Sequence, residues 1–536
     1  MRKRWLTGLI CGILAMSSLT APPAEAAAKK FNMSYLYFGK TSSYVGQVDR
    51  TKGSLNVVSP NYFDLNEDGS LKITWKLERS FIDEMHKRGI KVVPYVTSHW
   101  KLDIGRNAMA NRDKLSTEIA NAVNQYNLDG INVDIEGMTE TERDAHTDFV
   151  RLLREKMPGK EVSVAVAANP NGWTKGWHGS YDYGKLAQYA DYLMVMAYDE
   201  AWAGDPTAGP VASIGFVERS IQYALKQGVP NSKIVLGLPF YGRLWKSDGT
   251  FKGAGVSNVR VPTVLNKYGA NVVFDGATQS PKATFTVKES DEKLTVGYNT
   301  LTAGNYELWW EDERSLKAKL RLVQKYDLKG AGSWSLDQEE ASMWNYFSLW
   351  LNGLYFTDAQ THWANSEILA MVDKGWMLGT SSTTFAPETA LTRAQAAVIL
   401  VRAMGLQGVT PTETAKFWDV PANHWAGKEI DLAKQYGFIN GAGDNVFAPE
   451  REVSREEISA MLARILDLTA PTDGQTPFAD VDPNRWSYAS ILAMKENGVI
   501  NGYEDATFRP FNHTTRAQMA TLMSRIATQL EAKSVK

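Results

Sequence analysis

The stretch "LDGINVDIEG", residues 128–137, decides the fold expected of this chain. Its polar side chains Asn132, Asp134 and Glu136 alternate with isoleucine and valine. Successive side chains of a β-strand point to opposite faces, so the three polar groups share one face. Two carboxylates on the inner face of a buried strand are costly unless they are paired or take part in chemistry. The stretch therefore predicts a strand deep in the protein that carries a functional site.

Apolar strands and amphipathic helices alternate from about residue 30 to 340. Eight strands are predicted, over residues 31–39, 55–60, 90–96, 129–136, 161–168, 191–199, 233–242 and 330–336. A βαβ series of this length predicts the α/β class and a (β/α)8 TIM barrel. An open doubly wound sheet is the alternative, but no glycine-rich phosphate loop follows the first strand. Residues 246–305, between strands seven and eight, predict a small α+β insertion that forms one wall of a cleft.

The reactive groups of such barrels lie at the C-terminal ends of the strands. Glu136 ends the fourth predicted strand, and Asp134 lies one same-face step deeper, roughly 6.6 Å away along the strand. Two carboxyl groups this close couple their titrations and raise the pKa of one of them, as a general acid at neutral pH requires. The alternative interpretation is a buried polar ladder that merely fills the barrel.

The first 26 residues have the features of a secretory signal peptide, with a basic start, an apolar stretch and a small-x-small cleavage site. The apolar stretch is too short for a stable membrane span, so a transmembrane protein is not expected. The only cysteine, Cys11, lies there, so the secreted chain has no disulfide. Cleavage removes three basic residues and Glu25, which changes the formal net charge to −2 − 2 = −4. This charge gives no reason to expect nucleic-acid binding.

The residue types of metal and cofactor sites are scattered along the chain. His99, His146 and His178 form no pair at metal-ligand spacing, so neither a metal nor another cofactor is expected. Aromatic side chains are many, with 17 Trp and 22 Tyr. Five tryptophans close to predicted strand ends are candidates to line a long glycan cleft: Trp100, Trp173, Trp177, Trp202 and Trp245.

The stretch "LDGINVDIE" resembles the signature of glycoside hydrolase family 18, which includes chitinases and peptidoglycan N-acetylglucosaminidases. The resemblance extends over residues 30–340, because "MVMAYD" (194–199) and "GLPFYGR" (237–243) are similar to the family's sixth and seventh strands. Asn132 is a departure, since many chitinases have Asp there. The resemblance implies a secreted glycosidase that cleaves β-1,4 bonds of N-acetylglucosamine-containing glycans, with chitin and peptidoglycan both open as substrates.

Glycosidases normally use two opposed carboxyl groups, and no second one is evident at another strand end. The resemblance implies a retaining, substrate-assisted mechanism in which the N-acetyl group of the substrate is the nucleophile. It assigns Glu136 as the acid and base, Asp134 as the group that orients the acetamido group, and Tyr198 as a donor to that group. It places Trp334 beneath the sugar. The remaining substrate-binding candidates are Asn132, Met196, Asp199, Tyr241 and Arg243.

The last third of the chain contains an internal repeat. A Phe-x-Asp motif recurs every 61 residues, at Phe356, Phe417 and Phe478, and each unit later carries a Thr-Arg or Ser-Arg pair. Two amphipathic helices are predicted in each unit, the second opened by Arg393, Arg455 or Arg516. A hydroxyl residue before the arginine is a natural N-cap, and an arginine beside free helix amides makes a good anion site.

This all-α region resembles three surface-layer homology (SLH) repeats, with "TRAQ", "SREE" and "TRAQ" in place of the family's Thr-Arg-Ala-Glu. The resemblance implies that the three arginines bind a secondary cell-wall polymer and anchor a secreted enzyme non-covalently in a bacterial cell wall or S-layer. The predicted division is a signal peptide at 1–26, a catalytic domain at 27–350, and repeats at 355–410, 416–470 and 477–528. The alternative function is a structural S-layer-associated protein or a catalytically weak glycan-binding barrel.

The segment that joins the two parts is apolar rather than rich in Gly, Ser or Pro. Residues 341–356 predict that the last barrel helix runs almost directly into the first repeat, with only Asn352-Gly353 as a break. Trp344, Tyr346 and Trp350 do not all fit on one face of such a helix, so at least one of them is expected to contact the repeats.

Overall fold

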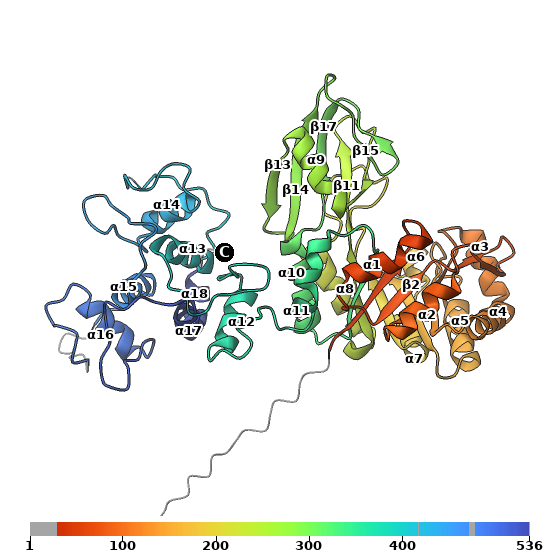
Figure 1. Ribbon diagram of the computed structural model, residues 1–536, viewed down its shortest axis with the longest axis horizontal. Coiled ribbons are helices and arrows are strands. Elements are labelled where there is room, and N and C mark those ends of the chain that lie inside the picture. The colour runs from red at the N-terminus through yellow and green to blue at the C-terminus, as the bar shows by residue number, and fades with distance from the viewer. Residues whose placement is uncertain (1–28, 416, 471–477, 535–536) are drawn as a thin grey trace, which may run out of the picture.

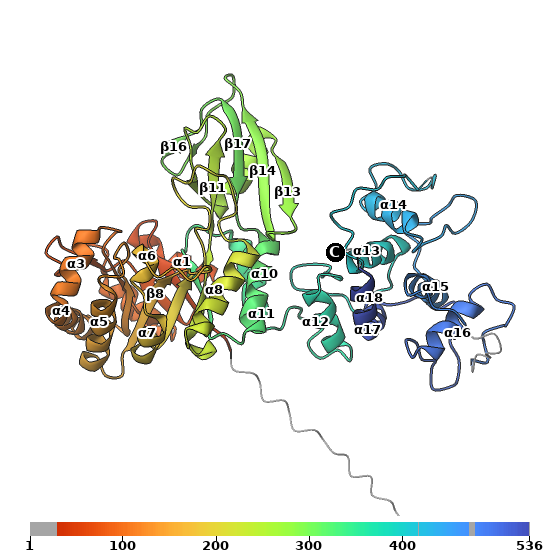
Figure 2. The same ribbon diagram turned by 180° about the vertical axis from the view of Figure 1, so that it is seen from behind.

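The computed structural model describes residues 29–415, 417–470 and 478–534. The barrel and the repeat region form two bodies joined side by side, and a smaller sheet projects from the barrel (Figures 1 and 2). The predicted signal peptide, residues 1–26, lies outside the described residues. The fold class predicted from the sequence is confirmed.

The strands of the first body are parallel and form a closed barrel in which the second and third strands are each interrupted. The strands are β1 (Phe31–Leu36), β2 (Val57–Pro60) with β3 (Phe63–Leu65), β5 (Lys91–Val92) with β6 (Tyr95–Thr97), β7 (Gly130–Asp134), β8 (Glu161–Ala167), β9 (Tyr192–Met196), β10 (Ile234–Pro239) and β18 (Gly330–Trp334). The β10 strand pairs with β18 and β18 with β1, while β2 pairs with β5 and β3 with β6, so the barrel closes. A short antiparallel strand, β4 (Leu71–Ile73), extends β3.

Amphipathic helices cover the outside of this barrel and bury their apolar faces against the strands. They are α1 (Tyr44–Arg50), α2 (Arg79–Lys87), α3 (Leu102–Ala110), α4 (Arg112–Gln125), α5 (Arg143–Lys156), α7 (Tyr183–Tyr189), α8 (Ile214–Lys226), α10 (Glu313–Lys325) and α11 (Phe347–Leu351). The short α6 (Gly176–Gly179) belongs to the loop after β8. A separate cluster of buried methionine, tyrosine and valine side chains, with Trp177, Tyr198 and Trp334 against it, fills the barrel interior.

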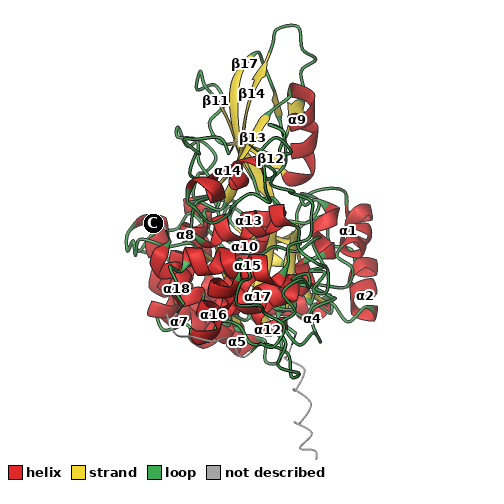
Figure 3. Cartoon of the chain, turned by 90° about the vertical axis from the view of Figure 1, so that its left-hand side faces the viewer, coloured by secondary structure: helices red, strands yellow, loops and turns green. Residues whose placement is uncertain are grey.

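The insertion is a five-stranded antiparallel sheet with one helix. It contains β11 (Tyr241–Lys246), β12 (Ala254–Ser257), β13 (Asn271–Asp275), β14 (Ser280–Val287), β17 (Gly304–Trp309) and α9 (Val261–Tyr268), beside the small pair β15 (Thr295–Val296) and β16 (Asn299–Thr300). Figure 3 shows this sheet standing above the helices. The prediction that strand seven extends to residue 242 is wrong, because β10 ends at Pro239 and Tyr241 already belongs to the insertion.

The second body contains two helices in each repeat and a final helix. They are α12 (Asn365–Asp373), α13 (Arg393–Ala403), α14 (Gly427–Gln435), α15 (Arg455–Ile465), α16 (Tyr488–Glu496), α17 (Arg516–Arg525) and α18 (Ala527–Lys533). Three backbone hydrogen bonds close a ring between the repeats, because Leu391 donates to Thr514, Thr514 to Val453, and Val453 to Leu391. The repeats are therefore three parts of one packed unit, as expected for repeats that are individually too small to bury a core.

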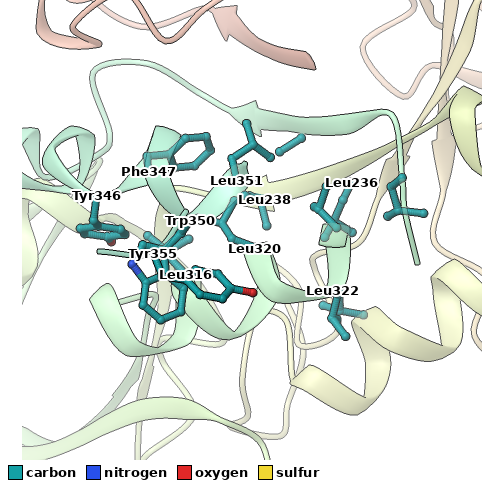
Figure 4. Close-up of a cluster of buried hydrophobic side chains, with 14 of the residues drawn as sticks. Leu236, Leu238, Leu316, Leu320, Leu322, Tyr346, Phe347, Trp350, Leu351 and Tyr355 are labelled. Atoms are coloured by element: carbon teal, nitrogen blue, oxygen red, sulfur yellow. The ribbon is translucent and has the colours of Figure 1, made fainter. Parts of the chain in front are cut away.

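The junction is shorter than the single helix predicted over 341–356. It consists of a 3-10 turn, Ala341–Asn345, then α11, and the chain turns at Gly353 with φ of 70°. The expectation of a contact with the repeats is confirmed: the ring of Trp350 lies 4.6 Å from that of Tyr355 and 6.1 Å from that of Phe356 (Figure 4). One buried apolar cluster runs from the barrel helices into the repeats.

Candidate active site

The polar face of β7 lies inside the barrel, as the alternation predicts. Asn132 is fully buried, and Asp134 is 6% exposed. The amide of Asn132 is satisfied within the barrel, since Tyr35 Oη donates to Oδ1 and Nδ2 donates to Ser163 Oγ, both at 2.8 Å. Asn132 therefore lies below the cleft and does not reach a surface that a substrate touches.

Asp134 is a buried carboxyl group with an unused oxygen. Among the described residues, no donor reaches its Oδ1. Burial raises the pKa of Asp134 to about 7, and the nearby His99 opposes that shift only in part. A buried polar atom without a partner carries a desolvation cost, which a ligand that supplies a donor relieves.

Glu136 lies just beyond the end of β7, where the loop after β6 packs against it. Burial raises the pKa of Glu136 well above its usual range, the charges of Asp134 and Asp199 raise it further, and a hydrogen bond with the Trp100 side chain lowers it. Gly137 permits this contact, because it has φ of 79° and a Cβ there would lie 2.7 Å from the Trp100 carbonyl oxygen. The geometry keeps a protonated carboxylic acid near neutral pH.

Two aromatic side chains from other strand ends border the same space. The pKa of Tyr198 is raised by burial, then by Tyr241, Asp134 and Glu136, so its hydroxyl is a proton donor near both carboxyl groups. Trp334 ends β18, and its ring lies 5.3 Å from that of Tyr35, 5.6 Å from Tyr37 and 6.2 Å from Tyr95 (centroid distances). The two side chains thus border the barrel mouth above the interior cluster.

The remaining predicted residues divide between the barrel and the insertion. Arg243, on β11, pairs with Asp199 at 2.6 Å and lies over the ring of Tyr241, with its Cζ 5.0 Å from the centroid. Tyr241 packs edge-on against Tyr198 at 6.2 Å. Met196 ends β9 and is buried in the interior cluster. The insertion therefore presents Arg243 and Tyr241, and Arg243 pairs with Asp199 from the loop after β9 of the barrel.

The five predicted cleft tryptophans divide into two groups, because Trp173 joins Trp100 and Trp177 through the ring of His178, whereas Trp202 and Trp245 lie apart from that row. Trp100 and Trp177 are in ring contact at 4.5 Å, whereas Trp202 belongs to the loop after β9 and is 52% exposed. Trp245 is buried, with its Nε1 donating to the Asp205 carbonyl oxygen. The sequence analysis missed Tyr181, whose hydroxyl accepts from Trp177 Nε1 at 3.2 Å and whose pKa is raised by burial and then by Glu136 and Asp134. No strand pattern marks it, since it lies in the loop before α7.

The three repeat arginines join neighbouring repeats. Each Nε donates to a backbone carbonyl of the next repeat: Arg393 to Phe447 at 2.7 Å, Arg455 to Phe508 at 2.9 Å and Arg516 to Phe385 at 2.7 Å. Thr392, Ser454 and Thr515 are the N-caps of these helices, as predicted, and each also forms a capping box. The expectation of free amides at these helix starts is wrong, because the backbone amides of the same arginines donate to Arg451, Asn512 and Thr389.

The surroundings of these three arginines differ in charge. Arg393 Nη1 pairs with Glu457 Oε1 at 2.6 Å, and Arg451 pairs with the same carboxylate. Gln395 and Gln518 occupy the position of Glu457 in the other repeats. In the described part of the chain, Nη1 of Arg455 and of Arg516 has no hydrogen-bond partner.

The described ranges contain neither a metal-binding cluster nor a membrane-spanning helix. No cluster of three or more histidine, cysteine or carboxylate side chains with metal-binding geometry occurs among residues 29–415, 417–470 and 478–534. None of the helices in those same ranges has the length and apolar composition needed to cross a membrane.

Comparison with known proteins places this geometry in a family context. The protein is 23% identical over 360 residues to the uncharacterized glycosylase YvbX of Bacillus subtilis, covering 64% of this chain and 97% of that one. It is 28% identical to the cortical fragment-lytic enzyme of B. subtilis over 43% of this chain and 52% of the other, so it spans about half of that relative. A chitinase structure from Chromobacterium violaceum superimposes with a TM-score of 0.53 at 23% identity, over 60% of this chain and 98% of that one, and shares the fold.

Residues 355–397, 416–458 and 477–520 match the S-layer homology domain, and such repeats indicate attachment at the cell surface. Residues 33–339, more than half of the chain, match the sequence pattern of glycosyl hydrolases family 18 and include both carboxyl groups at the end of β7. With its closed barrel and a pair of raised-pKa carboxyl groups at the barrel mouth, the chain belongs to glycosyl hydrolases family 18.

Proposed function

We propose that this protein is a retaining glycosidase that cleaves β-1,4 bonds next to N-acetylhexosamine residues by substrate assistance. The observation that carries the proposal is the pair at the end of β7, in which Glu136 has a raised pKa and buried Asp134 has an oxygen without a donor. An acetamido N–H supplies the donor that Asp134 lacks. The further carboxyl group among the predicted site residues, Asp199, is paired with Arg243 at 2.6 Å, which favours a nucleophile on the substrate rather than on the protein.

The proposed reaction has two steps. Glu136 gives its proton to the glycosidic oxygen as the bond to C1 breaks, and the acetamido carbonyl oxygen bonds to C1 from the other face. Asp134 accepts the acetamido N–H, and the Tyr198 hydroxyl donates to the acetamido oxygen. Glu136 then removes a proton from a water molecule that attacks C1. The bond between C1 and the acetamido oxygen breaks, and the configuration at C1 is retained. Trp334 packs beneath the sugar, whose flat apolar face it matches.

The remaining predicted residues have supporting roles in this proposal. Asn132 holds Tyr35 and Ser163 below the carboxyl groups and thereby positions β7. The Asp199–Arg243 pair and Tyr241 contact sugar hydroxyl groups from the insertion side, and Met196 completes the floor of the acetamido pocket. These assignments rest on the positions of the side chains around Glu136.

The test is Glu136→Gln assayed on N-acetylglucosamine oligomers and on purified peptidoglycan, with product identification by mass. Loss of the acid is expected to reduce turnover by about 10²–10⁴-fold or more while oligosaccharide binding and the melting temperature stay close to wild type. Asp129→Asn, which alters a carboxylate at the other end of the same strand, serves as the matched control for activity. Retention of more than about a tenth of wild-type turnover by Glu136→Gln rules out this acid.

The same proposal extends to location. The protein is secreted through the segment 1–26, and the repeats at 355–410, 416–470 and 477–528 anchor the domain at 27–350 to an anionic cell-wall polymer. Unpaired Nη1 groups of Arg455 and Arg516 support this assignment. Purified protein is expected to sediment with isolated walls, and a chain that ends at residue 353 is expected to stay in the supernatant. Equal sedimentation of the two proteins would contradict the anchor.

A further inference from the structure

A pocket of about 530 Å³ lies on the flank of the barrel, between the long loop after β8 and helices α5 and α8. Three basic side chains line it, namely Arg143, Arg219 and Lys226, together with the rings of Trp173 and His178. The roles assigned to Glu136 and Asp134 do not use these groups. The pocket thus combines excess positive charge with aromatic surface.

The positive charge of this pocket is not balanced by the protein. Within the described ranges, none of the three basic side chains forms an ion pair or a side-chain hydrogen bond, and Arg143 Nε is buried without a partner. The one carboxylate in the lining, Asp182, is already used, because it pairs with Lys185 at 3.1 Å and caps α7. An arginine whose Nε is buried without a partner gains from an incoming anion.

Two packed helices hold the three basic side chains of this pocket close together. Arg143 is the first residue of α5, whereas Arg219 and Lys226 are seven positions apart on α8 and share one helix face. Tyr223 stands between them on that face, and its ring lies 5.2 Å from that of Tyr183. The two helices thus hold three cations around one opening.

A ladder of aromatic rings connects the pocket with the catalytic acid. Trp100, which hydrogen-bonds to Glu136, lies 4.5 Å from Trp177. Trp177 lies 5.0 Å from His178, which lies 4.6 Å from Trp173 in the pocket lining (centroid distances). Burial lowers the pKa of His178, so the ladder is uncharged near neutral pH. Such a row of rings matches a glycan chain that leaves the acid toward the pocket.

We propose that this pocket binds a carboxylate carried by the glycan and thereby selects acid-substituted N-acetylhexosamine chains, the chemistry of lactyl-peptide branches in peptidoglycan, over uncharged chitin. The inference rests on the proposed function, because it takes the ring ladder as part of the substrate cleft. Arginine binds carboxylates through paired N–H groups, and Lys226 adds a point charge. An uncharged glycan leaves the three cations without a partner.

The test compares two ligands in two backgrounds. The double variant Arg219→Gln/Lys226→Gln keeps polar side chains and removes two charges. In the active protein, the ratio of kcat/KM for soluble uncrosslinked peptidoglycan strands to that for chitin oligomers is expected to fall by about tenfold. In the Glu136→Gln background, the Kd ratio for the same two ligands is expected to shift by the same factor, whether or not hydrolysis is detected.

Two controls separate the possible outcomes. Lys87→Gln/Lys114→Gln removes two exposed charges from α2 and α4 and is expected to leave both ratios unchanged. Peptidoglycan strands with amidated carboxylates are expected to lose the preference in the unaltered pocket. An unchanged Kd ratio in the pocket variant overturns the inference. If the active protein hydrolyses neither ligand but the Kd ratio shifts as expected, the proposed function is contradicted. The pocket is then still supported as a carboxylate site.

Discussion

Asp134 makes the stability of the barrel depend on pH because it is buried without a full set of partners. Its pKa in the folded protein is about 7, against roughly 3.9 in an unfolded chain. A folded-state pKa above the unfolded value favours the protonated native state. The stabilisation from this group is therefore complete below about pH 4 and is lost as the pH rises through about 7.

The corresponding prediction concerns Asp134→Asn, measured in the Glu136→Gln background so that only one carboxyl group titrates. The variant's unfolding free energy relative to its parent is expected to rise between pH 4 and pH 8. The upper bound is on the order of 4 kcal/mol, from about 1.4 kcal/mol per pKa unit. Urea denaturation at pH 4, 6 and 8 measures this difference, and a difference that is constant with pH would contradict a raised pKa.

The Tyr198 hydroxyl is predicted to act in the transition state rather than in binding. Tyr198→Phe removes the donor to the acetamido oxygen and keeps the ring against Tyr241. The expected result is a fall of about 10²-fold in kcat with little change in KM, as for the loss of one oxyanion-type donor. Steady-state kinetics on N-acetylglucosamine oligomers measure both constants. Tyr126→Phe, at the far end of α4, is the control, and equal kinetics for the two variants exclude the role.

For single residues, the sequence predicted where a side chain lies better than it predicted which residues that side chain contacts. Alternation was enough to place Asp134 and Glu136 on one face, because it depends only on neighbouring residues. The partners of Asn132 were out of reach, since Tyr35 is 97 positions away in sequence and meets it only when the barrel closes. The contact of Trp100 with Glu136 depends on the backbone turn at Gly137, and no pattern of side chains in the sequence predicts that turn.

At the scale of elements, the repeats look equal in sequence motif but differ in charge. The N3 position of each capping box is Gln395, Glu457 or Gln518, and only the glutamate reaches an arginine of the neighbouring repeat. Glu457 thus offsets one of the two arginine charges that it contacts, Arg393 and Arg451. Nη1 of Arg455 and of Arg516 has no such partner among the described residues, which leaves an N–H edge for an anionic polymer.

Glu457→Gln is therefore predicted to strengthen wall binding. Glutamine preserves the capping box, as it does in the other two repeats, and frees Arg393. Retention on isolated walls is expected to increase by about fivefold, which corresponds to roughly 1 kcal/mol for one added ion pair. Glu450→Gln removes the same charge from an exposed position in the same repeat and is the control. Equal retention of both variants and the wild type would show that Arg393 does not take part in wall binding.

Element boundaries were predicted less well where two sheets meet. The run 233–242 is apolar throughout, so periodicity alone does not reveal that the chain leaves the barrel after Pro239 and enters another sheet at Tyr241. That transfer carries Tyr241 and Arg243 into the wall beside Glu136. The helices that open with Thr-Arg or Ser-Arg were predicted well, because capping is a local interaction.

At the scale of the whole molecule, the apolar linker predicted a close junction, and the structure adds the polar contacts that fix it. From α10, Arg321 Nη1 donates to the Val372 carbonyl at 2.9 Å and Lys317 Nζ to the Ser382 carbonyl at 3.3 Å, both in the first repeat. The Lys317 ammonium also lies 4.5 Å from the centre of the Trp350 ring. The two hydrogen bonds were not predictable, since each joins residues more than fifty positions apart in sequence.

Trp350 is the side chain on which this junction depends. It is 4% exposed and packs between α10 and the first residues of the repeats (Figure 4). Trp350→Ala leaves a cavity that costs about 3–5 kcal/mol at a site shared by both bodies. We expect the variant to melt in two separated steps and to show a wider distribution of shapes in small-angle scattering than the wild type, for which we expect a single elongated envelope.

The matched control is Trp363→Ala, which removes a 62% exposed ring from the surface of the first repeat. It is expected to keep the wild-type envelope and one melting step, because no interface depends on that ring. A wild-type protein that already needs wide hinging to fit its scattering curve would contradict a fixed junction.

If the junction is fixed, the barrel mouth faces a set direction relative to Arg455 and Arg516. Wall attachment would then hold Glu136 at a constant height above the attachment surface. Trp350→Ala is therefore also expected to slow hydrolysis of intact walls, while hydrolysis of soluble oligomers continues.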